Sequence, residues 1–522
     1  MTTTDPEPAP APREDRFRRA ARAASGVLVL ALAGGAVAAA ARVGDAPVAP
    51  LAAVQVEVAP TPVTLQCPGP VLLPERTVRG DAAFDPAPVP AQVALDAVTA
   101  AGAGAGPLAV VATGPTGAAA DAPGGGGSLH LGDVDAPLAV RAQPRETSPV
   151  AAASVASVVT DGDARGLAAA SCRTPSSDDW LVGAATAVGS TATLVLTNPG
   201  LTVAQVELEV FGPTGPVDVS TTQHVVAAGG TKQIDLGGLA ADQAALVVHL
   251  TAAGGQVAAH VQDTAVRGFT PAGTDLVVPG DAPATRQVVT GLVVAESQVG
   301  SPDAPVLRLL APRDATTARI ALLGGDGPVA LPGAQDVALA AGEVTDVPLG
   351  GLPEGVYTVV VDAQAPVVAG AVTTSVGQQG GLDDEQRVER AWSASSALDA
   401  HGVVALPRGT DAAVVVGAVG RDADDTREAT ATLRVLGGDG RALSEHDVRV
   451  DAGTTGAWRV ADLAEGAVGV ELVPEGDVAV AWAVSLRVER EDGSLMAVLG
   501  PVPVTGSADA RDVREDARPA RG

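Results

Sequence analysis

Residues 206–215 read VELEVFGPTG, and this short stretch shows how most of the chain is built. Valine and leucine alternate with glutamate, so one side of the segment is apolar and the other is charged. Successive side chains of a strand point to opposite faces of a sheet, so the pattern predicts a half-buried β-strand. The Gly-rich tetrad 212–215 is typical of a tight hairpin turn.

Similar Gly-rich turns recur along the chain. The Gly-rich turns read GPTG at 114–117 and 212–215, and GGDG at 324–327 and 437–440. Each turn is followed by a Gly-led segment, interpreted as a strand, whose last apolar residues are Val134, Leu239, Leu352 and Leu463. Successive end residues are 105, 113 and 111 positions apart. A repeat of this length suits an immunoglobulin-like sandwich, so we predict an all-β chain of about four tandem β-sandwich copies.

The composition limits both the cores and the partners. Hydrophobic residues make up 46% of the 522 residues but aromatic ones only 2%, so the cores must be built from valine, leucine and alanine. The net charge of −28 repels the phosphates of nucleic acids, and no nucleic-acid partner is expected. The acidic runs at 161–163 and 422–425 lack the spacing of a calcium loop, so solvation is the simpler interpretation.

The N-terminus carries the pattern of an export signal. Five arginines precede an uncharged segment at 23–41, and Arg42 closes it. As a helix this segment would span roughly 28 Å, close to the thickness of a bilayer core. We expect the leader 1–22 in the cytoplasm and the bulk of the chain outside a single-pass cell-membrane anchor. A cleaved signal peptide is the competing interpretation, with 27–37 as its apolar run and 38–40 as its cleavage site.

The chain has only two cysteines, Cys67 and Cys172, and they agree with export. They lie near the two ends of the first copy, and an oxidising compartment favours a disulfide bond between them. Closing a loop of about a hundred residues is worth roughly 4–5 kcal/mol in the chain-entropy model. Two buried free thiols are the alternative.

The glycine pair 254–255 predicts a two-residue hairpin turn, and residues 474–476 predict a three-residue turn in the last copy. The first pairing places His249 opposite His260 on the outer face, about 5 Å apart. Two imidazoles can share a zinc ion, but such a site needs three or four ligands, and His224 is the nearest further histidine. An exposed pair is the simpler interpretation, so we predict no metal and no other cofactor.

The four tryptophans fall into two groups. Trp482 shares the apolar parity of its strand and Trp458 occupies a strand position, so both are expected in the core. Trp180 and Trp392 lie near junctions between copies. Packing between successive sandwiches and exposure to a partner are both open for these two.

No catalytic constellation stands out in the sequence. It holds no GxSxG elbow, no HExxH pair and no Walker loop, so we predict that the chain is not an enzyme and has no catalytic residues. The favoured function is a non-catalytic, extracytoplasmic cell-envelope protein that acts as a spacer or interaction scaffold. Its expected partners are the membrane, through 23–41, and other envelope proteins or wall glycans. A cell-wall polysaccharide binder and, less favoured, a β-sandwich hydrolase are the alternatives.

These patterns divide the chain into a leader, an anchor, a repeat region and a tail. The leader is 1–22 and the anchor is 23–41. The four sandwich copies are assigned to 55–172, 178–280, 286–380 and 390–505. Residues 507–522 are charged and are predicted to form a disordered tail.

One region resembles a known family. Its segments are CRTP at 172–175, DWLVG at 179–183, ATLVLTNP at 192–199, GPTG at 212–215 and LGGL at 236–239. Together they are similar to an uncharacterised actinobacterial envelope family catalogued as domain of unknown function number 5719, most clearly from Cys172 to Gln262. The resemblance implies an exported, membrane-anchored, β-rich protein of actinobacteria. It supplies no catalytic or binding residue.

Overall fold

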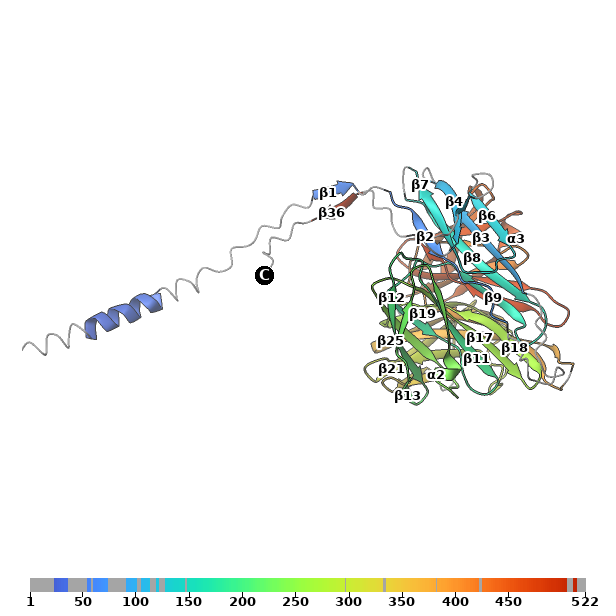
Figure 1. Ribbon diagram of the computed structural model, residues 1–522, viewed down its shortest axis with the longest axis horizontal. Helices are drawn as coiled ribbons and strands as arrows, with labels where there is room; N and C mark the ends of the chain where they lie inside the picture. The colour runs from blue at the N-terminus through green and yellow to red at the C-terminus, as the bar shows by residue number, and fades with distance from the viewer. Residues whose placement is uncertain are drawn as a thin grey trace, which may run out of the picture. The chain divides into compact units, whose positions relative to one another are not determined.

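A computed structural model describes most of the chain (Figure 1). The described residues are 23–35, 54–57, 60–73, 91–100, 105–112, 119–121, 127–145, 148–295, 297–331, 335–381, 383–421, 425–504 and 510–513. They fall into a body, Ala59–Ser507, and a smaller part made of Met1–Val58 and Ala508–Gly522. The prediction of an all-β chain with antiparallel sheets is confirmed.

The smaller part contains a helix and one pair of strands. Residues 23–35 are helical, and β1 (Val54–Glu57) pairs antiparallel with β36 (Ala510–Val513). Part of the tail predicted to be disordered is therefore a strand, because it finds a partner near the N-terminus. Among the described residues, no helix has the length and apolarity needed to cross a membrane. The leader 1–22 and residues 36–41 of the predicted anchor lie outside the described residues.

The body consists of four consecutive β units, each with two layers. The strands of the first unit are β2 (Val63–Gln66), β3 (Gln92–Thr99), β4 (Ala105–Ala112), β5 (Ala119–Asp121), β6 (Ser128–Gly132), β7 (Leu138–Pro144), β8 (Ala151–Val159) and β9 (Gly166–Ser171). They form the layers β2-β7-β4-β5 and β6-β3-β8-β9. Leu65 and Leu108 from one layer and Leu95 from the other are buried in one core, so the layers pack face to face.

The second unit repeats this plan with shorter loops. Its elements are β10 (Asp178–Val182), β11 (Ser190–Thr197), β12 (Ala204–Gly212), β13 (Gly215–Val217), β14 (Gln223–Val226), β15 (Thr231–Asp235), α2 (Leu236–Leu239), β16 (Val247–Ala253), β17 (Ala258–Arg267) and β18 (Thr270–Val277). One layer is β10-β16-β12-β13 with β14 beside β12, and the other is β15-β11-β17-β18. As the alternation predicts, Val206, Leu208 and Val210 of β12 are buried while Glu207 and Glu209 are exposed.

The third unit joins its two layers through one long strand. Its strands are β19 (Ala284–Val294), β20 (Val306–Leu310), β21 (Thr316–Gly324), β22 (Gly327–Val329), β23 (Asp336–Leu339), β24 (Val344–Pro348), β25 (Gly355–Gln379) and β26 (Gln386–Ala394). The first half of β25 pairs with β19 and β21, and its second half pairs with β20 and β26. Burial is interrupted at 362–366, where β25 passes from one layer to the other. Because β26 pairs with β25, it runs across the boundary at 390 that the sequence suggests.

The fourth unit again has two separate layers. Its elements are β27 (Gly402–Ala405), β28 (Asp411–Val419), β29 (Glu428–Leu436), β30 (Ala442–Asp451), β31 (Thr455–Arg459), α3 (Val460–Leu463), β32 (Gly469–Glu475), β33 (Ala479–Val488), β34 (Leu495–Leu499) and β35 (Val502–Pro503). The layers are β30-β29-β32-β27-β35 and β31-β28-β33-β34. Trp482 of β33 is 1% exposed in the core between them, and Trp458 packs against that core, as predicted.

Three of the four Gly-rich turns are confirmed as hairpin turns. Gly212 pairs with Gly215 between β12 and β13, and Gly324 pairs with Gly327 between β21 and β22. Residues 437–440 join β29 to β30. Gly215 and Gly327 have φ angles of 116° and 129°, which side chains rarely tolerate. The turn at 114–117 lies outside the described residues.

The apolar residues after these turns do not all end strands. Leu239 and Leu463 end the one-turn helices α2 and α3. In α2 the Asp235 carboxylate accepts a hydrogen bond from the Gly237 N–H at 2.9 Å, which begins a helical turn immediately after β15. The regular spacing of these apolar residues therefore marks the turn that follows a strand and not the end of the strand itself.

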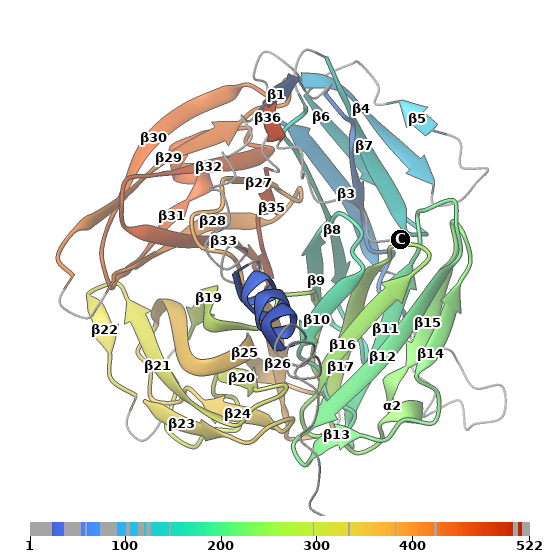
Figure 2. The same ribbon diagram turned by 90° about the vertical axis from the view of Figure 1, so that its left-hand side faces the viewer.

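The four units follow one another round a common centre, and the fourth returns to the first (Figure 2). Val403 of β27 is buried in the core of the first unit, and Leu167 of β9 is buried in the core of the fourth. Trp180 packs with Leu310 and other residues of the third unit, whereas Trp392 is buried in the core of the second. The two junction tryptophans thus pack between successive units, which settles the choice left open by the sequence.

Candidate functional site: the axis between the four units

One edge strand from each unit lies at the centre of the body. β9, β18 and β34 are each last in the strand order of a layer, and β26 pairs only with β25. Each of the four contacts the next in the order β9, β18, β26, β34 and back to β9. An edge strand presents unpaired N–H and C=O groups, which here face other edges inside the protein instead of solvent. We call this arrangement the axis.

The four axial strands run in the same direction, because the numbers of contacting residues rise together. The contacts are Arg165–Gly493 and Ser171–Gly500 between β9 and β34, Ala272–Arg390 and Asp281–Ser395 between β18 and β26, and Gly166–Thr274 and Arg173–Pro279 between β9 and β18. The approach is close. A Cβ on Gly273, whose φ is 98°, would lie 2.6 Å from Arg390 Cγ. Only glycine fits this position without moving a neighbouring strand.

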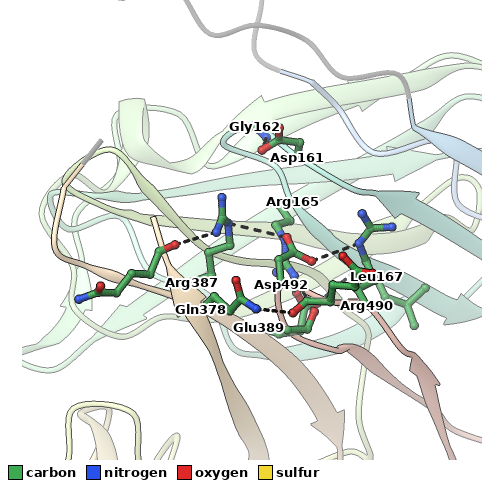
Figure 3. A network of polar contacts seen from close by, with 12 residues as sticks. Asp161, Gly162, Arg165, Leu167, Gln378, Arg387, Glu389, Arg490 and Asp492 are labelled. Carbon is green, nitrogen blue, oxygen red and sulfur yellow. Dashed lines mark hydrogen bonds and ion pairs between the residues drawn. The ribbon is translucent and has the colours of Figure 1, made fainter. Parts of the chain in front are cut away.

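Arg165 occupies the end of the axis where the strands begin (Figure 3). Its side chain is 1% exposed. Its Nε lies 3.1 Å from Asp492 Oδ2, and its Nη2 donates to the Gly493 carbonyl at 2.6 Å. Its Nη1 lies 3.7 Å from Glu389 Oε2, while Glu389 Oε1 accepts the Leu167 N–H at 3.0 Å. One guanidinium from the first unit therefore binds residues of the third and fourth units.

The pKa values of the two carboxylates beside Arg165 are shifted in opposite directions. Burial raises the pKa of Glu389 well above its usual range, and the nearby charge of Arg165 only partly opposes this. Partial burial also raises the pKa of Asp492, but the hydrogen bond and charge of Arg165 outweigh it and lower that pKa overall. Asp492 is the carboxylate closer to Arg165, and it also lies 3.4 Å from Arg490 Nε and 3.8 Å from Arg387 Nε. Glu389 bridges two strands, because it lies on β26 and accepts the Leu167 N–H of β9.

A second buried network lies further along the axis, between the second and third units. Asp263 Oδ2 accepts hydrogen bonds from Arg390 Nη1 at 2.9 Å and from Trp392 Nε1 at 2.8 Å. Asp275 Oδ2 accepts the Trp392 N–H at 2.7 Å. Burial raises the pKa of Asp275 well above its usual range, although the hydrogen bond from Trp392 opposes this. Asp263 and Asp275 face each other across β17 and β18 and are 0% and 1% exposed.

These networks are suited to fixing the units in register. Buried polar groups are costly unless they are paired, and these pairs join residues of different units. No substrate can reach the carboxylates of Asp263, Asp275 and Glu389 without separating the units, because all three are at most 1% exposed. The chemistry open to them is structural.

A pocket of about 230 Å³ occupies the opposite end of the axis, where the strands end. We call it the axial pocket. Its lining comes from all four units, chiefly from residues 170–174, 278–281, 392–397 and 500–503. Arg173 and Asp281 are its only charged lining residues. Ser393 and Ser396 also line it, and neither hydroxyl has a hydrogen-bond partner among the described residues.

Comparison with known proteins yields one match. The family of unknown function DUF5719 matches residues 129–461, from β6 in the first unit to α3 in the fourth. The chain belongs to this family. No curated protein and no solved structure matches the chain. The matched region of this DUF5719 protein contains three of the four axial strands, β9, β18 and β26.

The predicted disulfide of the DUF5719 chain is confirmed. Cys67 and Cys172 are bonded, with a Cα–Cα distance of 4.3 Å. Cys67 directly follows β2 and Cys172 directly follows β9, and both are at most 1% exposed. Cys172 also lines the axial pocket. The bond therefore fixes one wall of the pocket to the outer layer of the first unit.

The predicted hairpin that would pair the two histidines is wrong. β16 and β17 belong to different layers, so the turn at 254–255 joins layers instead of neighbouring strands. His249 lies opposite Glu209 and Trp180, whereas His260 lies opposite Val195. The turn at 474–476 likewise joins β32 and β33 of different layers. Apolar residues match in register across a core as well as across a hairpin, so the pattern did not distinguish the two cases.

The histidines have separate surroundings in this DUF5719 protein. His249 stacks on Trp180 with ring centroids 4.0 Å apart, and its Nδ1 lies 2.8 Å from Glu209 Oε2. Burial lowers the pKa of His260 to about 4, so its ring is neutral at ordinary pH. Over the part of the chain that the structure describes, no cluster of three or more His, Cys, Asp or Glu could hold a metal ion. Residues 422–424 of the second acidic run lie outside that part.

Sequence reasoning missed the axial residues. Asp275 stands directly before Leu276 and Val277 in β18, and Glu389 stands two residues before Ala391 in β26. A charged residue on the buried parity of a strand was the available signal. This signal is weak here, because acidic residues elsewhere in the chain alternate on exposed strand faces.

Proposed function

We propose that this DUF5719 protein is a non-catalytic cell-envelope protein that serves as a rigid extracytoplasmic interaction scaffold. In this proposal residues 23–41 tether it to the membrane, with the leader 1–22 inside the cell. Its copies are tandem sandwiches of immunoglobulin-like length with their own strand order, since β10 and β11 lie in different layers. Its partners are other proteins of the envelope.

The observation that carries the proposal is the closed axis. Arg165 binds Glu389 and Asp492 from two other units, and the first unit shares a core with the fourth. Units joined in this way form one stiff body and do not extend along a line. This favours a scaffold over a spacer, because a scaffold needs fixed surfaces whereas a spacer needs reach.

The alternatives receive less support. Wall-polysaccharide binding relies on exposed aromatic faces. The four tryptophans and Tyr357 are buried or half-buried, and Phe269, at 61%, is the one exposed aromatic ring among the described residues. A hydrolase needs carboxylates that reach a substrate. The best-placed pair, Asp263 and Asp275, is hydrogen-bonded and buried between units.

Protease treatment of intact spheroplasts tests location. Digestion of everything after Arg42, with the leader protected, is expected. Protection of the body would place it in the cytoplasm and overturn the proposal.

Crosslinking in cells followed by purification tests the role. Enrichment of specific envelope proteins supports a scaffold, and turnover of a wall glycan by the pure protein would contradict it.

A further inference from the structure

Two buried aspartates face each other where the second unit meets the third. Asp263 of β17 and Asp275 of β18 are directly opposite in the antiparallel register, and they are 0% and 1% exposed. Residues in such positions lie on the same face of the sheet, with their Cβ atoms about 4.5–5.5 Å apart. Both carboxyl groups bind one residue of the third unit, because Asp263 Oδ2 accepts the Trp392 Nε1–H and Asp275 Oδ2 accepts the Trp392 N–H. The two groups therefore converge on the same place in the contact between the units.

One oxygen of each carboxyl group lacks a donor. Asp263 Oδ1 and Asp275 Oδ1 are buried, and neither has a hydrogen-bond partner among the described residues. Buried polar atoms are nearly always paired, so two such oxygens on facing side chains need an explanation. A carboxylate can only accept hydrogen bonds, whereas a protonated carboxyl group carries one O–H donor. A single proton held between the two groups supplies the hydrogen bond that both oxygens lack.

The charges on β26 do not balance two carboxylates. Arg390 donates to Asp263 Oδ2 at 2.9 Å, and no other guanidinium among the described residues bonds to either aspartate. Glu389, on the same strand, brings a further carboxyl group that is 1% exposed. Burial raises the pKa of Asp275 well above its usual range, and the charge of Asp263 adds to this. Two neighbouring carboxylates in a buried site with one cation are costly to ionise together.

Two other buried guanidinium groups near β26 are bound to different partners. Arg165 lies before β9, and its Nε is 3.1 Å from Asp492 Oδ2. Arg308 of β20 covers the Trp392 ring at 5.2 Å, and its Nε lies 2.8 Å from Asp346 Oδ1. Neither is left to offset a second carboxylate beside Trp392. A proton is the remaining positive charge that can do so.

We propose that Asp263 and Asp275 share one proton, and that this proton locks the second unit to the third. With the proton in place, the pair presents a single negative charge to Arg390, and both carboxyl groups keep their bonds to Trp392. When a rise in pH removes the proton to water, two adjacent buried carboxylates repel each other and the contact between β18 and β26 loosens. The axis is then a pH-sensitive lock that is firmest in acid. This inference rests on contacts inside the body and not on where the protein is located, so either proposal can fail while the other stands.

Denaturant titration of the full chain between pH 5 and 8 tests the lock. An aspartate of the unfolded chain has lost its proton above about pH 4, so a proton held only by the folded state makes stability fall as the pH rises. Asp275→Asn keeps an acceptor for the Trp392 N–H and offers an N–H to Asp263 at every pH. Over this range the folding equilibrium constant of the wild type should fall at least tenfold more than that of Asp275→Asn. Equal pH dependence of the two proteins would overturn the proposal.

Asp218→Asn is the matched control, because Asp218 is exposed. Its folding equilibrium constant should follow that of the wild type within twofold at each pH. A flattened pH profile in Asp218→Asn as well would overturn the assignment of the effect to the buried pair.

Hydrogen exchange of the wild type locates the change. Raising the pH from 6 to 9 should release the amides of β18 and β26, including the Trp392 N–H, by more than the intrinsic base-catalysed increase in exchange rate. The amides of β12, which lies in the other layer of the second unit, should not exceed that intrinsic increase. Equal release of β12 and β26, or no extra release at β26, would overturn the assignment of the lock to this contact.

Infrared spectroscopy detects the proton directly and needs no variant to fold. The wild type at pH 7 should show the carbonyl band of a buried protonated carboxyl group, and this band should disappear as the pH is raised. Its absence at pH 7 would overturn the proposal. Asp275→Asn should weaken the band, and an unchanged band in that variant would assign the proton to another group and overturn the proposal as well.

Discussion

The two ends of the axis are built from the same four strands but are filled in opposite ways. At the beginning, Arg165 and Asp492 are paired, and Glu389 lies between Arg165 and the Leu167 N–H. At the end, small residues leave the axial pocket, and Ser393 and Ser396 remain without partners among the described residues. One end therefore closes the body and the other keeps a space open.

The difference shows how edge strands can be managed inside a protein. Four edges that converge cannot all form ladder hydrogen bonds with one another, so backbone groups remain to be satisfied. At the beginning and middle of the axis, carboxyl groups accept them, as Glu389 does for Leu167 and Asp275 for Trp392. At the other end of the axis the chain turns away into loops, so fewer backbone groups there need a partner. The first end should therefore govern the register of the four units.

The largest effect is expected from removing the disulfide, which secures the pocket end. Replacing both Cys67 and Cys172 by Ser should lower the free energy of unfolding by roughly 4–5 kcal/mol, because the bond spans 105 residues. Denaturant titration of the oxidised wild type and the double variant measures this. A loss below about 1 kcal/mol would show that the axis alone secures this end.

Breaking the charged end should cost slightly less. Arg165→Met removes the buried guanidinium that binds Asp492 and the Gly493 carbonyl, while Asp492 keeps Arg490 at 3.4 Å. Losing hydrogen bonds that involve a charged group typically costs about 1.5–3 kcal/mol. Arg441→Met is the matched control, since its side chain is 81% exposed, and it should change stability by less than about 0.5 kcal/mol. Similar unfolding midpoints for the two variants would contradict the role assigned to the charged end.

The pocket end should also make stability depend on pH. Burial raises the pKa of Asp179, next to Arg173 in space, to about 6. The folded state then holds a proton that the unfolded state has already lost, so stability falls as pH rises from about 4 to 6 and stays low above that. The shift corresponds to about 3 kcal/mol at pH 7. Asp179→Asn should remove this part of the pH dependence in unfolding experiments between pH 4 and 8, and an unchanged profile would contradict it.

The smallest effect is expected away from the axis. His249 pairs with Glu209 and Asp178, whose side chains are 61% and 64% exposed, so solvent screens both contacts. His249→Gln should change the free energy of unfolding by less than about 1 kcal/mol. A larger loss would mean that the outer face supports the axis through Trp180.

The sequence predicted strands and turns well, but it predicted less well which strands pair with one another. The alternation around Leu208 identified a real strand, and the glycines at 212–215 marked a real turn. The pairing of His249 with His260 failed because two strands that face each other across a core show the same apolar register as two strands in a hairpin. Periodicity reports which side of a strand is buried, but not what buries it.

The sequence by itself determined that the chain is β-rich and repetitive, because period-2 alternation and glycine turns are local properties. The two cysteines likewise indicated their bond, since no other partner exists. Only the tertiary structure decided that the four units close on one another, that Arg165 of the first reaches Glu389 of the third, and that a pocket remains between them. The physical reason is distance along the chain. Arg165 and Glu389 are 224 positions apart, and no local pattern in a strand encodes which distant edge it will meet.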